Sequence, residues 1–187
     1  MLVDRQPLIR SVKEKCRVCY TCVRECPAKA IRITDGQAEV VQERCIGCGN
    51  CVRVCSQNAK EFHRETDRVL ALIDDPQATT AAIVAPSFPA EFLDVPHPRV
   101  VGMLRALGFD HVLEVAVGAD LVAQAYRELL DHNDGRRYIA TTCPAIVRYV
   151  ENFYPELVEH LAPIVSPMVA TAKVVKRELD PGARVVF

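Results

Sequence analysis

Beyond residue 66 the chain alternates short apolar runs with segments of helical periodicity. Four apolar or β-branched runs predict strands at residues 81–84, 112–117, 138–141 and 184–187. Apolar side chains recur three or four positions apart, as helices require, at residues 68–75 (a short helix or connector), 100–107 and 118–132. Gly108 would end the second of these helices. Pro144 and Pro167 predict two further helix starts, because proline fits the first helical turn.

Strands that alternate with helices predict a parallel sheet with right-handed crossovers, covered by helices on both faces. The last run stops at the carboxyl end of a strand, where the functional loops of such sheets begin. We therefore expect residues 67–187 to form an α/β domain that is truncated, with further domains following Phe187.

The composition is that of a globular protein with a sizeable core. Half of the 187 residues are apolar, and no apolar run approaches the length of a membrane span. The net charge is −1 and no basic stripe is present, so the sequence offers no electrostatic case for nucleic-acid binding.

Eight of the nine cysteines form two runs of identical spacing, Cys-x2-Cys-x2-Cys-x3-Cys, near the N-terminus. Every cysteine of the first run recurs 29 residues later: Cys16, Cys19, Cys22 and Cys26, then Cys45, Cys48, Cys51 and Cys55. The segment is therefore an internal duplication. Pro27 follows the first run, whereas Ser56 follows the second. Gly47 and Gly49 flank Cys48, where a tight loop would let backbone N–H groups approach metal-bound sulfur.

Zinc and disulfide bonds explain these cysteines less well than iron–sulfur clusters do. Tetrahedral zinc uses two ligands from each Cys-x2-Cys pair and would leave the third cysteine of each run without a role. Disulfides need an oxidising compartment, and the N-terminus lacks the apolar segment of a signal peptide. The spacing therefore predicts iron–sulfur clusters in a cytoplasmic protein.

The duplicated run resembles two-cluster bacterial ferredoxins, in which three thiolates of a run bind one [4Fe–4S] cube and the fourth binds the other. The resemblance implies an α+β ferredoxin-like two-cluster domain over residues 1–66. It assigns the first cluster to Cys16, Cys19, Cys22 and Cys55, and the second to Cys45, Cys48, Cys51 and Cys26. This domain holds 12 Lys and Arg against 8 Asp and Glu. The excess positive charge would partly neutralise two thiolate-bound clusters, or it is ordinary surface charge.

Short motifs after the predicted strands add a second resemblance. Three stand in predicted loops and a fourth opens a predicted helix: Ala85-Pro86-Ser87, Gly118-Ala119-Asp120-Leu121, Thr141-Thr142-Cys143-Pro144, and Ser166-Pro167-Met168 followed by Lys173. Gly108-Phe109-Asp110 precedes the second of them. In this order, after a two-cluster segment, they resemble the catalytic domain of [FeFe]-hydrogenases, and the resemblance extends from about Lys13 onward.

The hydrogenase resemblance implies roles for five residues. Cys143 would be the first of four cysteines that hold the [4Fe–4S] part of the H-cluster. Ser87 and Lys173 would donate hydrogen bonds to cyanide ligands of the diiron unit, and Pro86 and Met168 would wall its pocket. A cysteine that precedes a proline-initiated helix lies near free backbone N–H groups, which favour the thiolate. Without the resemblance, the simpler interpretation is a structural thiol, core packing and a solvated lysine.

Two departures from the family pattern bear on hydrogen turnover. Efficient members carry a second cysteine directly before the ligand cysteine as a proton carrier, and here that position is Thr142. They also carry acidic residues in the helix after the Ala-Asp-Leu stretch, whereas the nearest carboxylate here is Glu128. A hydroxyl does not titrate near neutral pH, so proton transfer would be slower. No cysteine follows Cys143, so an H-cluster could be completed only in a longer protein.

Two functions remain open at this point, and with them the question of whether the chain is an enzyme. The first is the front part of an [FeFe]-hydrogenase-like oxidoreductase or hydrogen sensor. It would pass electrons between an H-cluster site and a soluble partner such as ferredoxin, through two N-terminal clusters. The second is a stand-alone two-[4Fe–4S] electron carrier or interaction module with no diiron site. The departures favour a sensory member over a bulk producer of hydrogen.

Overall fold

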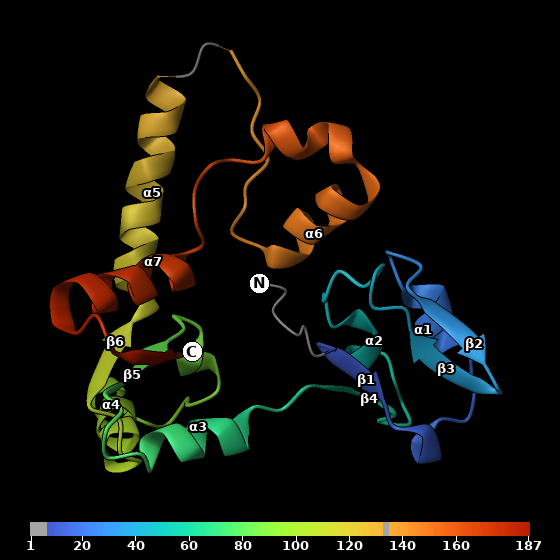
Figure 1. Cartoon of the computed structure of the whole chain (residues 1–187), viewed down its shortest axis with the longest axis horizontal. Helices are drawn as coiled ribbons and strands as arrows, with labels where there is room; N and C mark the ends of the chain where they lie inside the picture. The colour runs from blue at the N-terminus through green and yellow to red at the C-terminus, as the bar shows by residue number, and fades with distance from the viewer. Residues whose placement is uncertain (1–6, 133–134) are drawn as a thin grey trace. The chain divides into compact units, whose positions relative to one another are not determined.

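A computed structural model describes residues 7–132 and 135–187 of the chain. The described residues divide into two compact units, each drawn in Figure 1. The first unit contains the residues up to Arg64 together with residues 143–159, and the second contains residues 65–142 together with residues 160–187. A segment from the second half of the chain therefore belongs with the cysteine-rich unit, which no local sequence pattern indicated.

The first unit is made of short elements. Its strands are β1 (Ile9–Ser11), β2 (Ile31–Thr34), β3 (Gln37–Val40) and β4 (Lys60–Phe62). Its helices are α1 (Thr21–Glu25), α2 (Asn50–Arg53) and α6 (Pro144–Phe153), with a 3₁₀ turn at Lys13–Lys15. A second 3₁₀ turn, Pro155–His160, ends at the first residue of the second unit. β1 pairs with β4 and β2 pairs with β3, both antiparallel. The strand pairs join the two halves of the duplication, because β1 precedes the first run and β4 follows the second.

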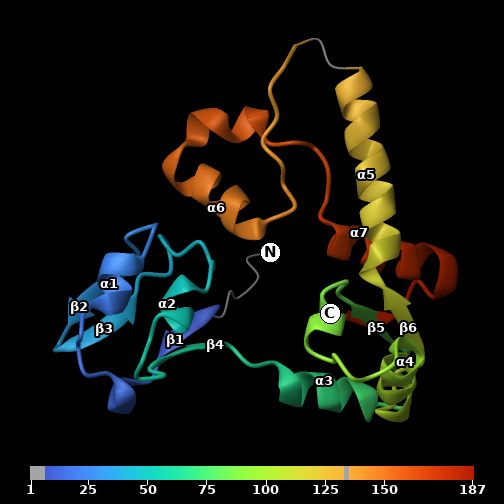
Figure 2. The same ribbon diagram turned by 180° about the vertical axis from the view of Figure 1, so that it is seen from behind.

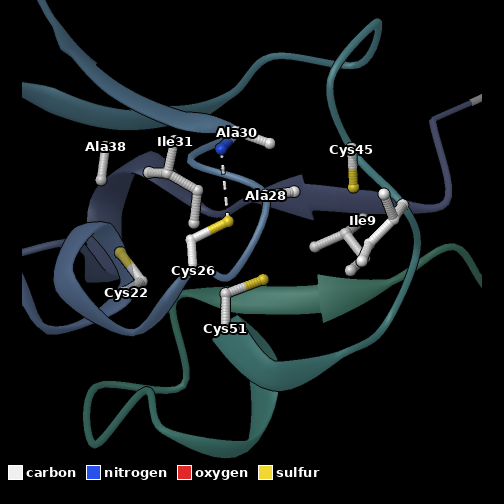
Figure 3. Packing of buried hydrophobic residues seen from close by; sticks show 10 residues of the cluster. Ile9, Cys22, Cys26, Ala28, Ala30, Ile31, Ala38, Cys45 and Cys51 are labelled. Atoms are coloured by element: carbon white, nitrogen blue, oxygen red, sulfur yellow. Dashed lines mark hydrogen bonds between the residues drawn. The ribbon is translucent and has the colours of Figure 1, made fainter. Parts of the chain in front are cut away.

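The core of the first unit is built from cysteines and small apolar residues rather than from large side chains. Its buried members are Ile9, Cys22, Cys26, Ala28, Ala30, Ile31, Ala38, Cys45, Ile46 and Cys51. Figure 3 shows nine of these residues with labels, packed between the strands and the two short helices. So few large side chains contribute little hydrophobic stabilisation. Hydrophobic burial alone therefore gives this unit little stability.

The second unit contains a three-stranded parallel sheet and four α-helices among its described residues. The strands are β5 (Thr80–Val84), β6 (His111–Glu114) and β7 (Arg184–Val186). The helices are α3 (Thr66–Ile73), α4 (His97–Ala106), α5 (Val115–Asp131) and α7 (Pro167–Val174), followed by the π-helical turn Val175–Leu179, and a 3₁₀ turn spans Phe88–Ala90. The strand order is β6-β5-β7, with β5 parallel to both neighbours. The predicted parallel sheet is therefore confirmed.

The sheet differs from the sequence prediction at its second strand. Residues 112–117 were expected to be extended, but β6 ends at Glu114 and α5 begins at Val115. Val115 is buried at the start of the helix, so its apolar side chain fits either interpretation. The Gly118-Ala119-Asp120-Leu121 motif consequently lies inside α5, which confirms the helix predicted over residues 118–132 and corrects the placement of the motif in a loop.

The predicted strand at residues 138–141 is also absent from the sheet. Ile139 instead forms an isolated parallel bridge with Leu161. Its N–H donates to the His160 carbonyl oxygen at 2.7 Å, and its carbonyl oxygen accepts from the Ala162 N–H at 2.9 Å. The apolar run therefore satisfies its backbone in a loop, and the third strand of the sheet is β7.

Helices α5 and α7 lie against each other in the second unit, as Figures 1 and 2 both show. Gly118 makes this approach possible. A Cβ atom there would lie 2.2 Å from the Thr171 hydroxyl oxygen and 2.3 Å from the Pro167 carbonyl oxygen. The glycine is thus required by helix packing. Within the described ranges, every helix is too short or too polar to span a lipid bilayer.

Candidate metal centres

Two cavities of the first unit are each lined by four cysteines. One cavity is lined by three cysteines of the first run and the last of the second: Cys16, Cys19, Cys22 and Cys55. The other is lined by the complementary set: Cys26, Cys45, Cys48 and Cys51. The fold brings together the same two groups that the crossed ferredoxin spacing gives. We name them site one and site two. Figure 3 shows Cys26, Cys45 and Cys51 of site two.

Matched cysteines of the duplication occupy matched environments at two positions. Cys22 on α1 and Cys51 on α2 are buried, whereas Cys19 and Cys48, in the loops before these helices, are exposed. Each site therefore has one cysteine at the surface, and site one has one buried cysteine whereas site two has three, since Cys26 and Cys45 are buried as well. A cofactor bound at either site would be held mainly by protein and still reach solvent at one side.

The backbone follows the same path around both cysteine runs. Left-handed φ angles occur in pairs of residues 29 positions apart: Val18 (52°) and Gly47 (72°), Tyr20 (61°) and Gly49 (75°), Lys29 (48°) and Asn58 (50°). Glycine adopts this conformation freely, whereas for other residues it is less favourable by about 1–2 kcal/mol of conformational free energy. At Gly49 even a Cβ would be crowded, since it would lie 2.7 Å from the Phe62 ring. Val18 and Tyr20 keep the loop shape despite its cost, which indicates that the site requires that shape.

Backbone N–H groups point at one sulfur atom in each site. The Ala30 N–H donates to the Cys26 Sγ at 3.3 Å, as the dashed line in Figure 3 shows. The Ala59 N–H donates to the Cys55 Sγ at 3.2 Å. Such donors stabilise a thiolate and shift the potential of a cluster bound to it.

The cysteines differ in how readily they ionise. Burial raises the pKa of the Cys51 thiol to about 11 and also raises the pKa of the Cys22 thiol, while the positive charge of Lys60 opposes both shifts. The pKa of Cys19 is lowered, chiefly by its side-chain hydrogen bond with Thr21. The Cys22 and Cys51 thiols therefore keep their protons at neutral pH without metal, and metal binding has to displace those two protons.

The donor set suits a cluster better than a single ion. Among residues 7–132 and 135–187, no three His, Cys, Asp or Glu side chains lie close enough together to hold one metal ion. Zinc gathers its thiolates around one atom at about 2.3 Å. The four thiolates of a [4Fe–4S] cluster bind four different iron atoms and stay further apart. Four cysteines with N–H donors at the sulfurs fit such a cluster.

Sequence reasoning missed one charged residue beside these sites. Lys60 is the first residue of β4, lines site one and is only 3% exposed. The position 29 residues earlier is Ile31, which is buried and lines site two. Comparing the two halves of the duplication residue by residue would have revealed a lysine where its counterpart is apolar.

Cys143 lies outside both four-cysteine groups. It is exposed and occupies the N-terminal cap of α6, whose first residue is Pro144 as predicted. The helix itself belongs to the first unit. Asn152 donates a hydrogen bond to the Glu43 carbonyl oxygen at 3.2 Å, and the Arg44 guanidinium stacks 5.0 Å from the centroid of the Phe153 ring. The packing of α6 therefore places Cys143 on the unit that carries the other eight cysteines.

The four candidate residues of the diiron pocket are divided between two places in the second unit. Met168 and Lys173, both on α7, line one cavity together with Ile83 of the sheet. Pro86 and Ser87 follow β5 in an exposed loop and are not among the residues that line it. The described residues thus bring together one pair of the predicted four.

The Gly108-Phe109-Asp110 motif has a structural role. Gly108 has a φ of 111°, and a Cβ there would lie 2.6 Å from the Ile73 side chain. Phe109 is buried. The Asp110 carboxylate accepts hydrogen bonds from the Thr80 N–H at 2.7 Å and the Thr80 hydroxyl at 3.0 Å, which lower the pKa of this carboxyl. The motif therefore fixes the end of α4 to the start of β5.

Comparison with known proteins connects this chain to iron-only hydrogenases and to 4Fe-4S dicluster domains. Residues 78–187 match the family model "Iron only hydrogenase large subunit, C-terminal domain", and residues 8–56 match "4Fe-4S dicluster domain". Iron hydrogenase 1 of Clostridium pasteurianum is 31% identical over 114 residues, 54% of this chain and 20% of that protein. The cytosolic Fe-S cluster assembly factor NAR1 of Yarrowia lipolytica is 26% identical over 83 residues, 44% of this chain and 17% of that protein.

A solved structure gives the same relationship. It belongs to a study of how oxygen inactivates [FeFe]-hydrogenase through its H-cluster, and it superposes with a TM-score of 0.50 at 25% identity. The match covers 64% of this chain and 34% of that chain. This chain therefore spans about a third of that structure and about a fifth or less of the curated relatives it matches. The family match covers more than half of the chain, so this is a 4Fe-4S, hydrogenase-like protein that belongs to the iron-only hydrogenase large-subunit family.

Proposed function

We propose that the first unit binds two [4Fe–4S] clusters and transfers electrons. Site one would be held by Cys16, Cys19, Cys22 and Cys55, and site two by Cys26, Cys45, Cys48 and Cys51. The observation that carries this proposal is the pair of cavities, each lined by four cysteines drawn from both runs. Bound there, the clusters would accept and release single electrons.

The residues of the unit support this role in three ways. Ala30 and Ala59 direct N–H groups at sulfur, which stabilises charged thiolates. Burial of Cys22 and Cys51 excludes water from one side of each site. Exposure of Cys19 and Cys48 leaves the other side open to a redox partner. A soluble carrier such as ferredoxin is the partner we propose.

We further propose that the chain forms the front part of a hydrogenase-like oxidoreductase or hydrogen sensor. In a longer protein, Cys143 would be one cysteine ligand of an H-cluster, and Pro86, Ser87, Met168 and Lys173 would contribute to its diiron pocket. The family match and the exposed cap position of Cys143 support this role. A cytoplasmic location is part of the proposal, since the Yarrowia relative is named as cytosolic.

The residues around the Cys143 loop favour slow or regulatory hydrogen chemistry. Thr142, directly before Cys143, is exposed and does not titrate near neutral pH. The preceding hydroxyl, on Thr141, is engaged with the carbonyl oxygens of Ala162 at 3.1 Å and Ile164 at 2.5 Å. Glu128 accepts a hydrogen bond from Gln124 on the exposed surface of α5. None of these three groups is a free acid beside Cys143.

Serine substitutions test the proposed ligand sets. Two clusters correspond to about eight iron atoms per chain. Cys16→Ser and Cys45→Ser should each lower the iron content of anaerobically reconstituted protein to about half. Cys55→Ser should remove the same electron paramagnetic resonance (EPR) signal as Cys16→Ser, although the two cysteines belong to different runs. Cys143→Ser is the matched control and should keep both signals.

Two results would decide against this assignment. Full iron content in Cys16→Ser and Cys45→Ser would mean that these cysteines are not ligands. Loss of the same signal in Cys16→Ser and Cys26→Ser would mean that each run binds its own cluster.

A further inference from the structure

Lys60 is a buried cation for which the described chain provides no anion. Its side chain is 3% exposed and donates hydrogen bonds to the Ser11 hydroxyl and the Ala38 carbonyl oxygen. Both acceptors are uncharged. The neighbouring glutamate, Glu61, pairs with Arg10 on the surface at 2.5 Å. Among residues 7–132 and 135–187, no carboxylate forms an ion pair with Lys60.

Burying an ammonium group without an opposite charge is unfavourable by several kcal/mol in general. Buried lysines are therefore found beside an anion or lose their proton. Lys60 lines site one together with its four cysteines, so a group held by those thiolates would bring negative charge beside it. A [4Fe–4S] cluster with four thiolates carries a net negative charge and provides the missing anion.

The duplication places this lysine at one site only, although its charge also acts on Cys51 of site two. Lys60 stands five residues after Cys55 and begins β4, whereas its counterpart Ile31 stands five residues after Cys26 and begins β2. Ile31 is also buried, and it lines site two. The backbone repeats closely at both places, since the residue before each donates its N–H to the preceding cysteine sulfur. The two halves therefore differ here by a full positive charge.

We propose that Lys60 is the built-in counter-ion of the cluster at site one and raises its reduction potential relative to site two. This inference rests on the proposed function, because it requires clusters at both sites. A positive charge in a water-excluded environment favours the reduced, more negative state of a cluster. The transferred electron would consequently reside preferentially at site one.

The test is a redox titration of the anaerobically reconstituted chain, followed by EPR. Lys60→Gln keeps a hydrogen-bond donor for Ser11 and Ala38 but removes the charge. We expect Lys60→Gln to lower the reduction potential of one cluster by at least about 59 mV, which is a tenfold decrease in the equilibrium constant of a one-electron reduction. Lys60→Arg keeps the charge and should retain the original potential. Lys29→Gln is the matched control, because Lys29 is exposed and its charge is screened by water.

The affected cluster is assigned in a Cys48→Ser background, which leaves only site one complete. In that background Lys60→Gln should still shift the remaining potential. Unchanged potentials in Lys60→Gln, with both clusters present, would overturn the counter-ion role alone. If Lys60→Gln does not bind a cluster, Lys60→Met serves as the variant without the charge. Reduction potentials that shift equally in Lys60→Arg, which keeps the charge, and in Lys60→Met would also overturn the counter-ion role. Unsubstituted protein that binds no clusters would instead overturn the proposed function, and this inference with it.

Discussion

Replacing Gly118 with alanine tests the packing of α5 on α7. The new Cβ would lie 2.2 Å from the Thr171 hydroxyl oxygen, whereas ordinary contacts of a Cβ begin at 3.4 Å. To relieve this overlap, the two helices would have to move apart by about 1 Å. This movement costs free energy, because the packed interior resists deformation. Thr171 cannot simply turn away. It is fully buried, and its hydroxyl donates to the Pro167 carbonyl oxygen at 2.9 Å.

The size of the effect follows from two opposing contributions. Overpacking costs about 1–3 kcal/mol, and the upper end applies because two neighbours of the Cβ, the Pro167 carbonyl oxygen and the Thr171 nitrogen, are backbone atoms. Alanine in place of glycine inside a helix returns about 1 kcal/mol. We therefore expect Gly118→Ala to lower the free energy of unfolding by about 2 kcal/mol.

Gly102 is the matched control for this substitution. It lies in α4, and a Cβ there would meet no atom within 4 Å. Gly102→Ala should therefore raise the free energy of unfolding by up to about 1 kcal/mol. Urea unfolding of the full chain, followed by far-UV circular dichroism, measures both changes as shifts of the midpoint at equal slope. A Gly118→Ala chain as stable as Gly102→Ala would refute the packing argument.

Two further predictions concern backbone and charge. Asp110→Asn should reduce the acid sensitivity of the fold. The Thr80 hydrogen bonds lower the pKa of Asp110. The ionised carboxylate therefore stabilises the fold fully at a pH above the ordinary aspartate pKa, and this stabilisation is lost as the pH falls through the lowered pKa. Urea midpoints at pH 7 and pH 3 should differ less in Asp110→Asn than in the unsubstituted chain, and equal differences would argue against this role. Val18→Gly should raise the free energy of unfolding by about 1 kcal/mol, and with it the thermal unfolding midpoint, because Val18 has a left-handed φ of 52°. A lower midpoint would show that the loop is not strained at Val18.

The cysteine groups could be predicted because their information is local and repeated. Eight cysteines at fixed intervals, 29 residues apart in pairs, leave few ways to form two four-cysteine groups. The loop shape was also partly predictable, since Gly47 and Gly49 occupy left-handed positions. That Val18 and Tyr20 adopt the same angles was not predictable, because neither residue favours them.

The parts that failed depend on contacts distant in sequence. Residues 138–141 have the composition of a strand, but pairing of Ile139 with Leu161 decides their conformation. Val115 is equally apolar as the last residue of a strand or the first of a helix, so periodicity could not locate the boundary before α5. The assignment of α6 to the cysteine-rich unit rests on contacts such as Asn152 with Glu43, more than 100 residues apart.

Lys60 shows a different limit. A lysine is expected at the surface, and its burial results from strands β1, β3 and β4 meeting beside site one. In the sequence, only the duplication indicated burial of Lys60, because the matching residue Ile31 is apolar. Internal repeats thus deserve comparison for their differences as well as for their identities.

The central claim is that the first unit holds two [4Fe–4S] clusters, and Mössbauer spectroscopy of the isotope-enriched chain, isolated without oxygen, tests it most directly. We predict about eight iron atoms per chain, all in [4Fe–4S] signals of two clusters. Zinc in place of iron, isolated iron ions, or about four iron atoms in a single cluster would contradict the account.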